Sequence, residues 1–174
     1  CTKNGSDGEN EQACPYAQAL PYLAKSSIGF GKTKTIETAL YLQDERHFSL
    51  SMRQVGSAIG RGGQAVKKAV ALARQAQERF QHAVSERGRE VLSSLKPGEK
   101  ALVLIGRNYN TCDPGANMGL PSRIGNLGVQ AIPMDYLPLK SADPVGLDDM
   151  YWHSGKKILA AARIIREHPD LFPV

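Results

Sequence analysis

Apolar residues recur every three or four positions along a long stretch of the chain, and this spacing predicts a helix over 63–95. A Lys-Pro-Gly sequence directly after it ends the helix. A shorter helix is predicted over 52–59, with Ser49 or Ser51 as its N-cap and a glycine-rich turn after it. The pattern therefore predicts a helical hairpin over 49–98.

The second half of the chain alternates between strand-like and helix-like patterns. Residues 101–105 form an uninterrupted apolar run of strand length, which is typical of a parallel sheet covered on both faces. A helix is predicted over 117–127 and a second short strand over 129–133, which is the spacing of a strand–helix–strand unit with a parallel crossover. A final helix is predicted over 150–167.

Together these elements predict an α/β fold, with a Rossmann-like, three-layer core around a parallel sheet and a long-helix appendage. We expect residues 1–48 and 99–174 to form the α/β core, and residues 49–98 to form a basic helical hairpin. The first 45 residues are less informative, because the apolar run at 36–42 is compatible with either a helix or a strand.

The composition is that of a soluble globular protein. The chain has 174 residues, 41% hydrophobic and 22% charged, which suits one domain or a compact core with one appendage. No apolar run reaches the ~18 residues of a membrane-spanning helix. No targeting segment is visible, so the cytoplasm is the expected location. The start at Cys1 resembles a processed lipoprotein, but a piece cut from a longer chain is the favoured interpretation.

Positive charge is concentrated in the predicted hairpin. The chain has 22 Lys and Arg against 17 Asp and Glu, a net charge of +5, and residues 51–100 alone hold ten basic and four acidic residues. A helix-turn-helix could use such positive charge to contact the phosphates of a nucleic acid. The second predicted helix is too long for that motif, however, and its basic residues lie all around the helix and do not form one stripe. Nucleic acid is therefore not the expected partner. The turn before Lys67 and Lys68 could bind an anion, although a plain connector is favoured.

Several catalytic and metal-binding motifs are incomplete. Gly29-Phe-Gly-Lys-Thr33 ends like a phosphate-binding loop, but Ser26 stands where the motif requires glycine. No Gly-x-Ser-x-Gly elbow is present, and the four histidines lack metal-ligand spacing. Cys1, Cys14 and Cys112 form no Cys-x-x-Cys pair, although thiolates from distant segments can converge on one cluster. These observations argue against an NTPase, a triad hydrolase and a zinc ribbon.

The segment 106–117 follows the strand predicted at 101–105, at the position where open α/β sheets bind their ligands. A turn with local side-chain bonds explains part of its composition, above all Asp113-Pro-Gly115. It does not explain an arginine and a tyrosine at a strand end, so a binding role and a plain turn stay open as alternatives. The candidate ligand-binding residues are Arg107, Tyr109, Asn110, Asp113 and Asn117.

Four segments, 10–15, 102–121, 129–138 and 150–159, resemble the activase-related proteins of the 2-hydroxyacyl-CoA dehydratase system. The second of these reads Leu-Val-Leu-Ile-Gly-Arg-Asn-Tyr-Asn-Thr-Cys-Asp-Pro-Gly-Ala-Asn-Met-Gly-Leu-Pro. The resemblance identifies the chain as a fragment of a CoA-substrate-specific enzyme activase. Such proteins join an ATPase domain to a region similar to the cluster-binding dehydratase subunits, and this chain carries no phosphate motif of the ATPase part.

This resemblance implies iron–sulfur-linked electron transfer to an acyl-CoA dehydratase-type partner, in concert with the ATPase domain of the parent polypeptide. In the related dehydratases, cysteines of Rossmann-like domains hold a [4Fe–4S] cluster. Cys14, in its Cys-Pro setting, best matches a cluster and metal ligand, and Cys1 and Cys112 are further cofactor-binding candidates. No catalytic residue is assigned. The alternative hypothesis is a non-catalytic α/β module that binds a nucleotide- or CoA-like anion at the 106–117 loop.

Overall fold

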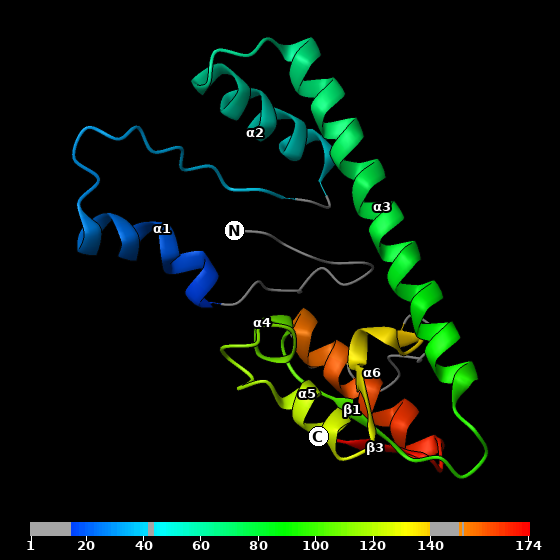
Figure 1. Ribbon diagram of the computed structural model, residues 1–174. Coiled ribbons are helices and arrows are strands. Elements are labelled where there is room, and N and C mark those ends of the chain that lie inside the picture. Colours follow the sequence, from blue (N-terminus) through cyan, green and yellow to red (C-terminus); the bar gives the residue numbers. More distant parts are fainter. Residues whose placement is uncertain (1–14, 42–43, 140–149, 151) are drawn as a thin grey trace. The chain divides into compact units, whose positions relative to one another are not determined.

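The computed structural model describes most of the chain (Figure 1). The described residues are 15–41, 44–139, 150 and 152–174. The chain divides into two compact units, and the division falls after Gln77, inside the longest helix. The first unit also includes residues 152 and 153. The predicted separation of 49–98 from 1–48 and 99–174 stays a prediction.

The first unit contains α1 (Pro15–Ile28), α2 (Glu45–Ala58) and the beginning of α3 (Gly63–Ser94). The predicted consecutive helices are therefore confirmed, and α3 ends within one residue of the expected position. The two helices pack closely beside their joining turn, because a Cβ added at Gly56 would collide with the Val66 side chain. No helix in the described part of the chain is long and apolar enough to cross a membrane.

The beginning of α2 corrects the predicted N-caps Ser49 and Ser51, which both lie inside the helix. Asp44 is the N-cap instead, and its side chain accepts a hydrogen bond from the backbone N–H of His47 at 3.0 Å. This bond, and the contact with the His47 imidazole, lower the pKa of the Asp44 carboxyl below its ordinary value. Ser51 is buried, and its hydroxyl donates to the carbonyl oxygen of Ala39 at 2.8 Å.

The segment between the first two helices is irregular wherever it is described. Residues 36–41 form neither helix nor strand, which resolves the ambiguity of that apolar run. An ion pair between Lys25 and Glu37, at 3.0 Å, joins α1 to this segment. The Lys34 ammonium donates to the carbonyl oxygen of Ala58 at 2.8 Å, at the end of α2. A cation is favourable at that helix end because the helix dipole is negative there.

Three parallel strands form the sheet of the second unit: β1 (Ala101–Leu104), β2 (Gln130–Pro133) and β3 (Leu171–Pro173). Their order is β2-β1-β3, and in the β1–β2 register Val103 lies opposite Ile132. The parallel pairing of β1 with β2 confirms the predicted strand–helix–strand unit. The third strand was not expected, and it adds a second parallel neighbour to β1.

The helices of the second unit connect these strands. They are the end of α3, α4 (Asn108–Thr111), α5 (Leu120–Asn126), the short 3-10 helix η1 (Met134–Tyr136) and α6 (His153–Glu167). The helices predicted over 117–127 and 150–167 are confirmed with shorter bounds, whereas α4 was expected to be loop. The α/β class, the parallel sheet and the helical part of the predicted fold are confirmed.

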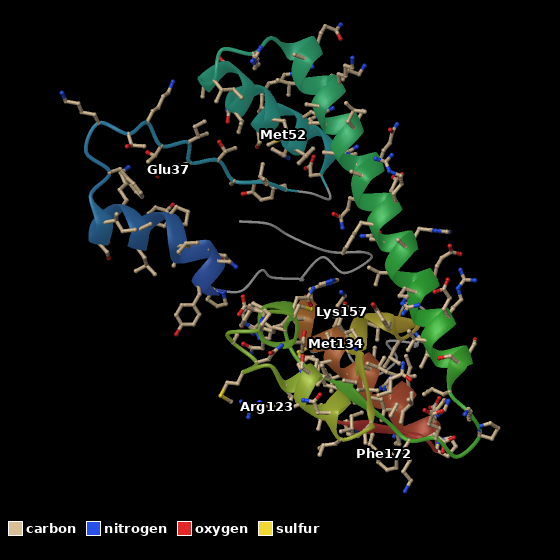
Figure 2. The ribbon with its side chains drawn as sticks, viewed as in Figure 1. Glu37, Met52, Arg123, Met134, Lys157 and Phe172 are labelled. Carbon is tan, nitrogen blue, oxygen red and sulfur yellow. The ribbon has the colours of Figure 1, made fainter. Side chains whose placement is uncertain are left out.

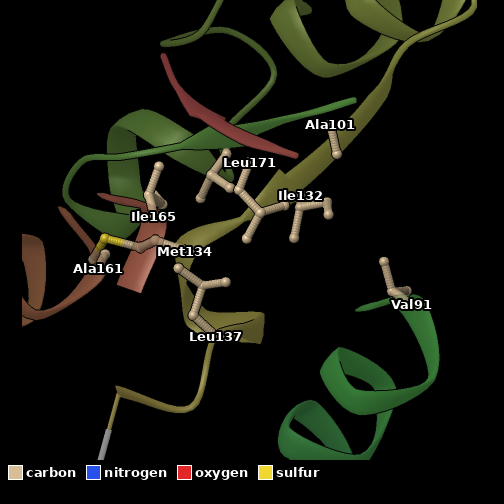
Figure 3. Close-up of a cluster of buried hydrophobic side chains, with 9 residues drawn as sticks. Val91, Ala101, Ile132, Met134, Leu137, Ala161, Ile165 and Leu171 are labelled. Atoms are coloured by element: carbon tan, nitrogen blue, oxygen red, sulfur yellow. The ribbon is translucent and has the colours of Figure 1, made fainter. Parts of the chain in front are cut away.

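A cluster of buried apolar side chains holds the second unit together (Figure 3). It joins the sheet to α3, η1 and α6, and its largest fully buried side chains are Ile132, Met134 and Val103. The full cluster is Val91, Ala101, Val103, Ile132, Met134, Leu137, Ala161, Ile165 and Leu171. Burial of this apolar surface is the main force that fixes these elements around the sheet.

An ion pair reinforces the contact between α6 and η1. The Lys157 ammonium lies 3.0 Å from an Asp135 carboxylate oxygen, and the two side chains are 36% and 21% exposed. Lys157 and Met134, the first residue of η1, are both labelled in Figure 2. Because the pair is partly shielded from water, it holds η1 in place more firmly than a fully exposed pair would.

Candidate functional site

The segment that follows β1 is compact because it contains α4. Arg107 has extended backbone angles and is the N-cap residue of this short helix. The Arg107 carbonyl oxygen accepts backbone hydrogen bonds from Asn110 at 2.7 Å and from Thr111 at 3.0 Å. The predicted loop 106–117 is therefore an ordered turn of helix followed by a tight bend. It leads away from the carboxyl end of the central strand, as the sequence pattern indicated.

Two of the predicted ligand-binding residues shape this bend. The Asp113 carboxylate accepts a hydrogen bond from the backbone N–H of Ala116 at 2.8 Å. The Asn117 side chain donates to the Thr111 carbonyl oxygen and accepts from the backbone N–H of Gly119, both at 3.0 Å. These are the local side-chain bonds of a plain turn. Asp113 and Asn117 thus have a structural role, whether or not a ligand binds here.

The other predicted ligand-binding residues lie at the beginning of α4 and on its surface. The Arg107 guanidinium donates to the Tyr109 hydroxyl at 3.1 Å, and the Tyr109 side chain is 60% exposed. Asn110 is exposed on the same turn of α4. The structure therefore places an arginine, a phenol and an amide together on the surface beside the end of β1. Such a group can bind an anion, but it is open to water.

Of the predicted cofactor cysteines, Cys112 is the one that the structure describes. It is a free thiol, exposed, and its sulfur lies 3.6 Å from the Thr111 hydroxyl oxygen. Cys1 and Cys14 lie outside the described residues. Within the described residues no group of three His, Cys, Asp or Glu side chains could hold a metal ion. A [4Fe–4S] cluster usually takes four thiolates, so the described residues do not form a cluster site by themselves.

A hollow of ≈ 400 Å³ lies next to Cys112, between the end of α3, the edge of β2 and the turn after α4. Its apolar lining includes Val91, Leu104 and Pro121. Its polar lining consists of Arg87, Thr111, Cys112, Gln130 and Tyr136. A concave, mainly apolar surface with a few convergent polar groups is the usual form of a small-molecule site.

The close approach of α3 to η1 shapes one side of this hollow. A Cβ added at Gly88 would lie 2.8 Å from both the carbonyl carbon and the Cα of Tyr136, so only glycine permits the observed packing. One turn of α3 further on, Val91 enters the hydrophobic cluster. This packing brings Arg87 and Tyr136 to the same hollow, although they are far apart in the sequence.

The charge at the hollow comes from Arg87. One of its guanidinium nitrogens lies 3.1 Å from a Glu90 carboxylate oxygen, and the two side chains are 62% and 67% exposed. Exposed pairs of this kind contribute little to stability and exchange partners readily. An anionic ligand in the hollow could therefore take over the guanidinium, which forms bidentate hydrogen bonds with phosphates and carboxylates.

Most residues that line the hollow, including Arg87, Gln130 and Tyr136, were not among the sequence-predicted candidates. These three come from a helix, a strand and a 3-10 helix, and only the tertiary fold brings them together. One signal was present: an isolated glycine inside a long helical pattern, Gly88, often marks close packing.

Comparison with known proteins identifies the family. The model of the CoA enzyme activase uncharacterised domain matches residues 1–137, which is most of the chain. The chain therefore belongs to the CoA enzyme activase uncharacterised domain family, as the resemblance in its sequence implied. The matched region includes α1 to α5, the sheet strands β1 and β2, and all residues that line the hollow. No curated protein and no solved structure matches the chain.

Proposed function

We propose that this domain works within a CoA enzyme activase that delivers electrons, through an iron–sulfur cluster, to an acyl-CoA dehydratase-type partner. The observation that carries the proposal is the family match over residues 1–137, which spans all three cysteines. We further propose that the parent polypeptide supplies the ATPase domain, and that the protein acts in the cytoplasm. The low-potential electron chemistry belongs to the cluster when it is bound.

The cysteines are assigned different roles in this proposal. Cys14 is the principal cluster ligand and Cys1 a second one, and both lie outside the described residues. Cys112 is a third candidate, but its exposed thiol has no further metal-ligating side chain grouped with it in the described part of the chain. The remaining thiolates of a four-ligand set would come from outside this chain. The described residues support the cluster by fixing the fold around the sheet.

The test compares the full-length wild type with two variants, each with one cysteine replaced by serine, and all three proteins are prepared without oxygen. We expect the wild type to show thiolate-to-iron charge-transfer absorbance and to activate a dehydratase when supplied with ATP and a reductant. Cys14→Ser should lose both properties. Cys112→Ser tests the third candidate ligand: if this variant keeps the absorbance, Cys112 does not bind the cluster, and if it loses the absorbance, Cys112 is also a ligand. A colourless wild type that activates nothing would refute the proposal.

A second candidate function is that of a non-catalytic module that binds a CoA-like anion beside the 106–117 segment. The hollow favours it, because it joins an apolar lining to an arginine near the carboxyl end of β1. Thermal unfolding in chelator separates the two functions. A protein that keeps its full thermal stability in chelator and is stabilised by acetyl-CoA would favour the binding module.

A further inference from the structure

The hollow lies beside β2, which is an edge strand of the sheet among the described residues. In the sheet order β2-β1-β3, β2 pairs with β1 on one side, and no other described strand pairs with it on the other side. Gln130, Ala131 and Pro133 of this strand all line the hollow. A strand edge presents backbone N–H and C=O groups that can pair with an extended chain containing amide groups. The hollow therefore offers two kinds of surface to one ligand, an apolar lining and an amide-binding edge.

Two side chains in the hollow have unused hydrogen-bonding groups. The Gln130 amide and the Tyr136 hydroxyl are half-buried, and neither forms a side-chain hydrogen bond with another described residue. Each can donate as well as accept. Polar groups that converge on a concave surface fix the orientation of a ligand by hydrogen bonding and so provide specificity.

We propose that the hollow binds the pantetheine arm of a CoA thioester, with the phosphate end of the arm at Arg87. The arm is an extended chain with two amides. These amides can form hydrogen bonds with the backbone of β2, the Gln130 amide and the Tyr136 hydroxyl. Its methylene and methyl groups match the apolar side chains of Val91 and Leu104. The inference deepens the second candidate function, a module that binds a CoA-like anion, by assigning that binding to specific residues of the hollow.

The size and charge of the hollow select this part of CoA. A volume of ≈ 400 Å³ is at the lower end of the ~300–1,000 Å³ typical of small-molecule sites, so it suits the arm and leaves the adenine nucleotide in solvent. The exposed pair between Arg87 and Glu90 contributes little to stability, so the diphosphate at the end of the arm, with two negative charges against one on the carboxylate, can replace Glu90 as the partner of Arg87. Neither Arg107 nor Tyr109 lines the hollow, so this site is distinct from the exposed surface of α4.

Cys112 provides a direct reporter, because its thiol lines the hollow and is exposed. The full-length protein is alkylated with iodoacetamide, and the rate at this position is followed by peptide mass mapping. We expect acetyl-CoA and S-methyl 4′-phosphopantetheine to slow the alkylation of Cys112 at least fivefold at saturation. Adenosine 3′,5′-bisphosphate, which lacks the arm, should leave the rate unchanged.

Two arginines on α3 provide matched variants. Arg87 and Arg89 each form one exposed ion pair with a glutamate three residues away, but only Arg87 lines the hollow. Arg87→Gln should weaken protection by acetyl-CoA about tenfold, because a charge-assisted hydrogen bond to phosphate is lost. Arg89→Gln should change the affinity less than about twofold. Circular dichroism checks that both variants keep the wild-type helix content.

Three results would overturn the inference. These are protection by the adenosine bisphosphate alone, no protection by either arm-containing ligand, and equal weakening by Arg87→Gln and Arg89→Gln.

The iron content of the same sample distinguishes failure of the arm site from failure of the proposed electron-transfer function. An iron-containing protein whose Cys112 is not protected refutes the arm site and leaves the electron-transfer proposal standing. Protection of Cys112 in an iron-free protein supports the arm site and contradicts the cluster.

Discussion

Replacing Gly88 by alanine tests how closely α3 packs on η1. On an exposed helix this change stabilises by up to ~1 kcal/mol, because alanine has the higher helix propensity. At Gly88, however, the new Cβ would lie 2.8 Å from the carbonyl carbon and the Cα of Tyr136, well inside the 3.4–4 Å of ordinary contact. Because these neighbours are backbone atoms, no side-chain rotation can relieve the collision.

The expected loss of stability follows from this geometry. Relieving the collision moves α3 away from η1 and partly exposes Val91, which is 8% exposed in the hydrophobic cluster. Overpacking costs ~1–3 kcal/mol and loss of part of a valine's burial adds ~1 kcal/mol, against a propensity gain of at most ~1 kcal/mol. The net destabilisation is therefore about 2 kcal/mol, which lowers Tm by roughly 4–8 °C in a chain of this size.

Gly125→Ala is the matched control for Gly88→Ala. Gly125 is exposed in α5, and a Cβ added there would meet nothing within 4 Å. Differential scanning calorimetry of both variants measures Tm, and hydrogen exchange at β1 reports on the second unit alone. Gly88→Ala should lower Tm and speed exchange, whereas Gly125→Ala should leave both unchanged or improve them. Equal stability of the two variants would refute the close packing of α3 on η1.

Two further predictions concern the core and a surface ion pair. Ile132→Ala should lower the free energy of unfolding by ~3 kcal/mol in urea, because Ile132 is fully buried. Leu127→Ala, at a side chain 80% exposed, should change it by less than ~0.5 kcal/mol, and similar losses would contradict the assigned core. The Arg74 guanidinium donates to the Glu45 carboxylate and lowers its pKa, so Arg74→Met should raise that pKa toward the ordinary 4.5 in an NMR titration. The pKa of Glu45 is lower in the folded protein than in the unfolded chain. The stabilisation of the folded state by the Arg74–Glu45 pair is therefore present above pH 4.5 and is lost as the pH falls through the folded-state pKa. A Glu45 pKa that does not change in Arg74→Met would contradict the pairing.

The elements with a local pattern were predictable from the sequence, and the third strand was not. The apolar runs at 101–105 and 129–133 and the periodic stretch of α3 carry their signal within a few neighbouring residues. β3 has three residues and no periodicity. Backbone bonds to the β1 segment fix it, with Asp170 accepting from Ala101 at 2.9 Å and Val174 accepting from Ile105 at 2.8 Å. Such non-local pairing leaves no trace in the sequence pattern.

The candidate site was predictable only in part, for a similar reason. Turn chemistry identified Asp113 and Asn117, and their side chains form local bonds of the expected kind. The hollow depends on Arg87, which reads in the sequence as one of many charges on an exposed helical face. It becomes a site residue because Gly88 lets α3 approach η1, which is a consequence of tertiary packing. Sequence reasoning therefore found the loop and missed the surface beside it.

We propose that this member of the CoA enzyme activase uncharacterised domain family acts with an iron–sulfur cluster. The most direct measurement is the iron and acid-labile sulfide content of the full-length protein isolated without oxygen. We expect about four iron and four sulfide for each cluster-containing protein, and a large loss of both in Cys14→Ser. Iron-free protein that is folded and still binds acetyl-CoA, or equal iron in the wild type and Cys14→Ser, would contradict it.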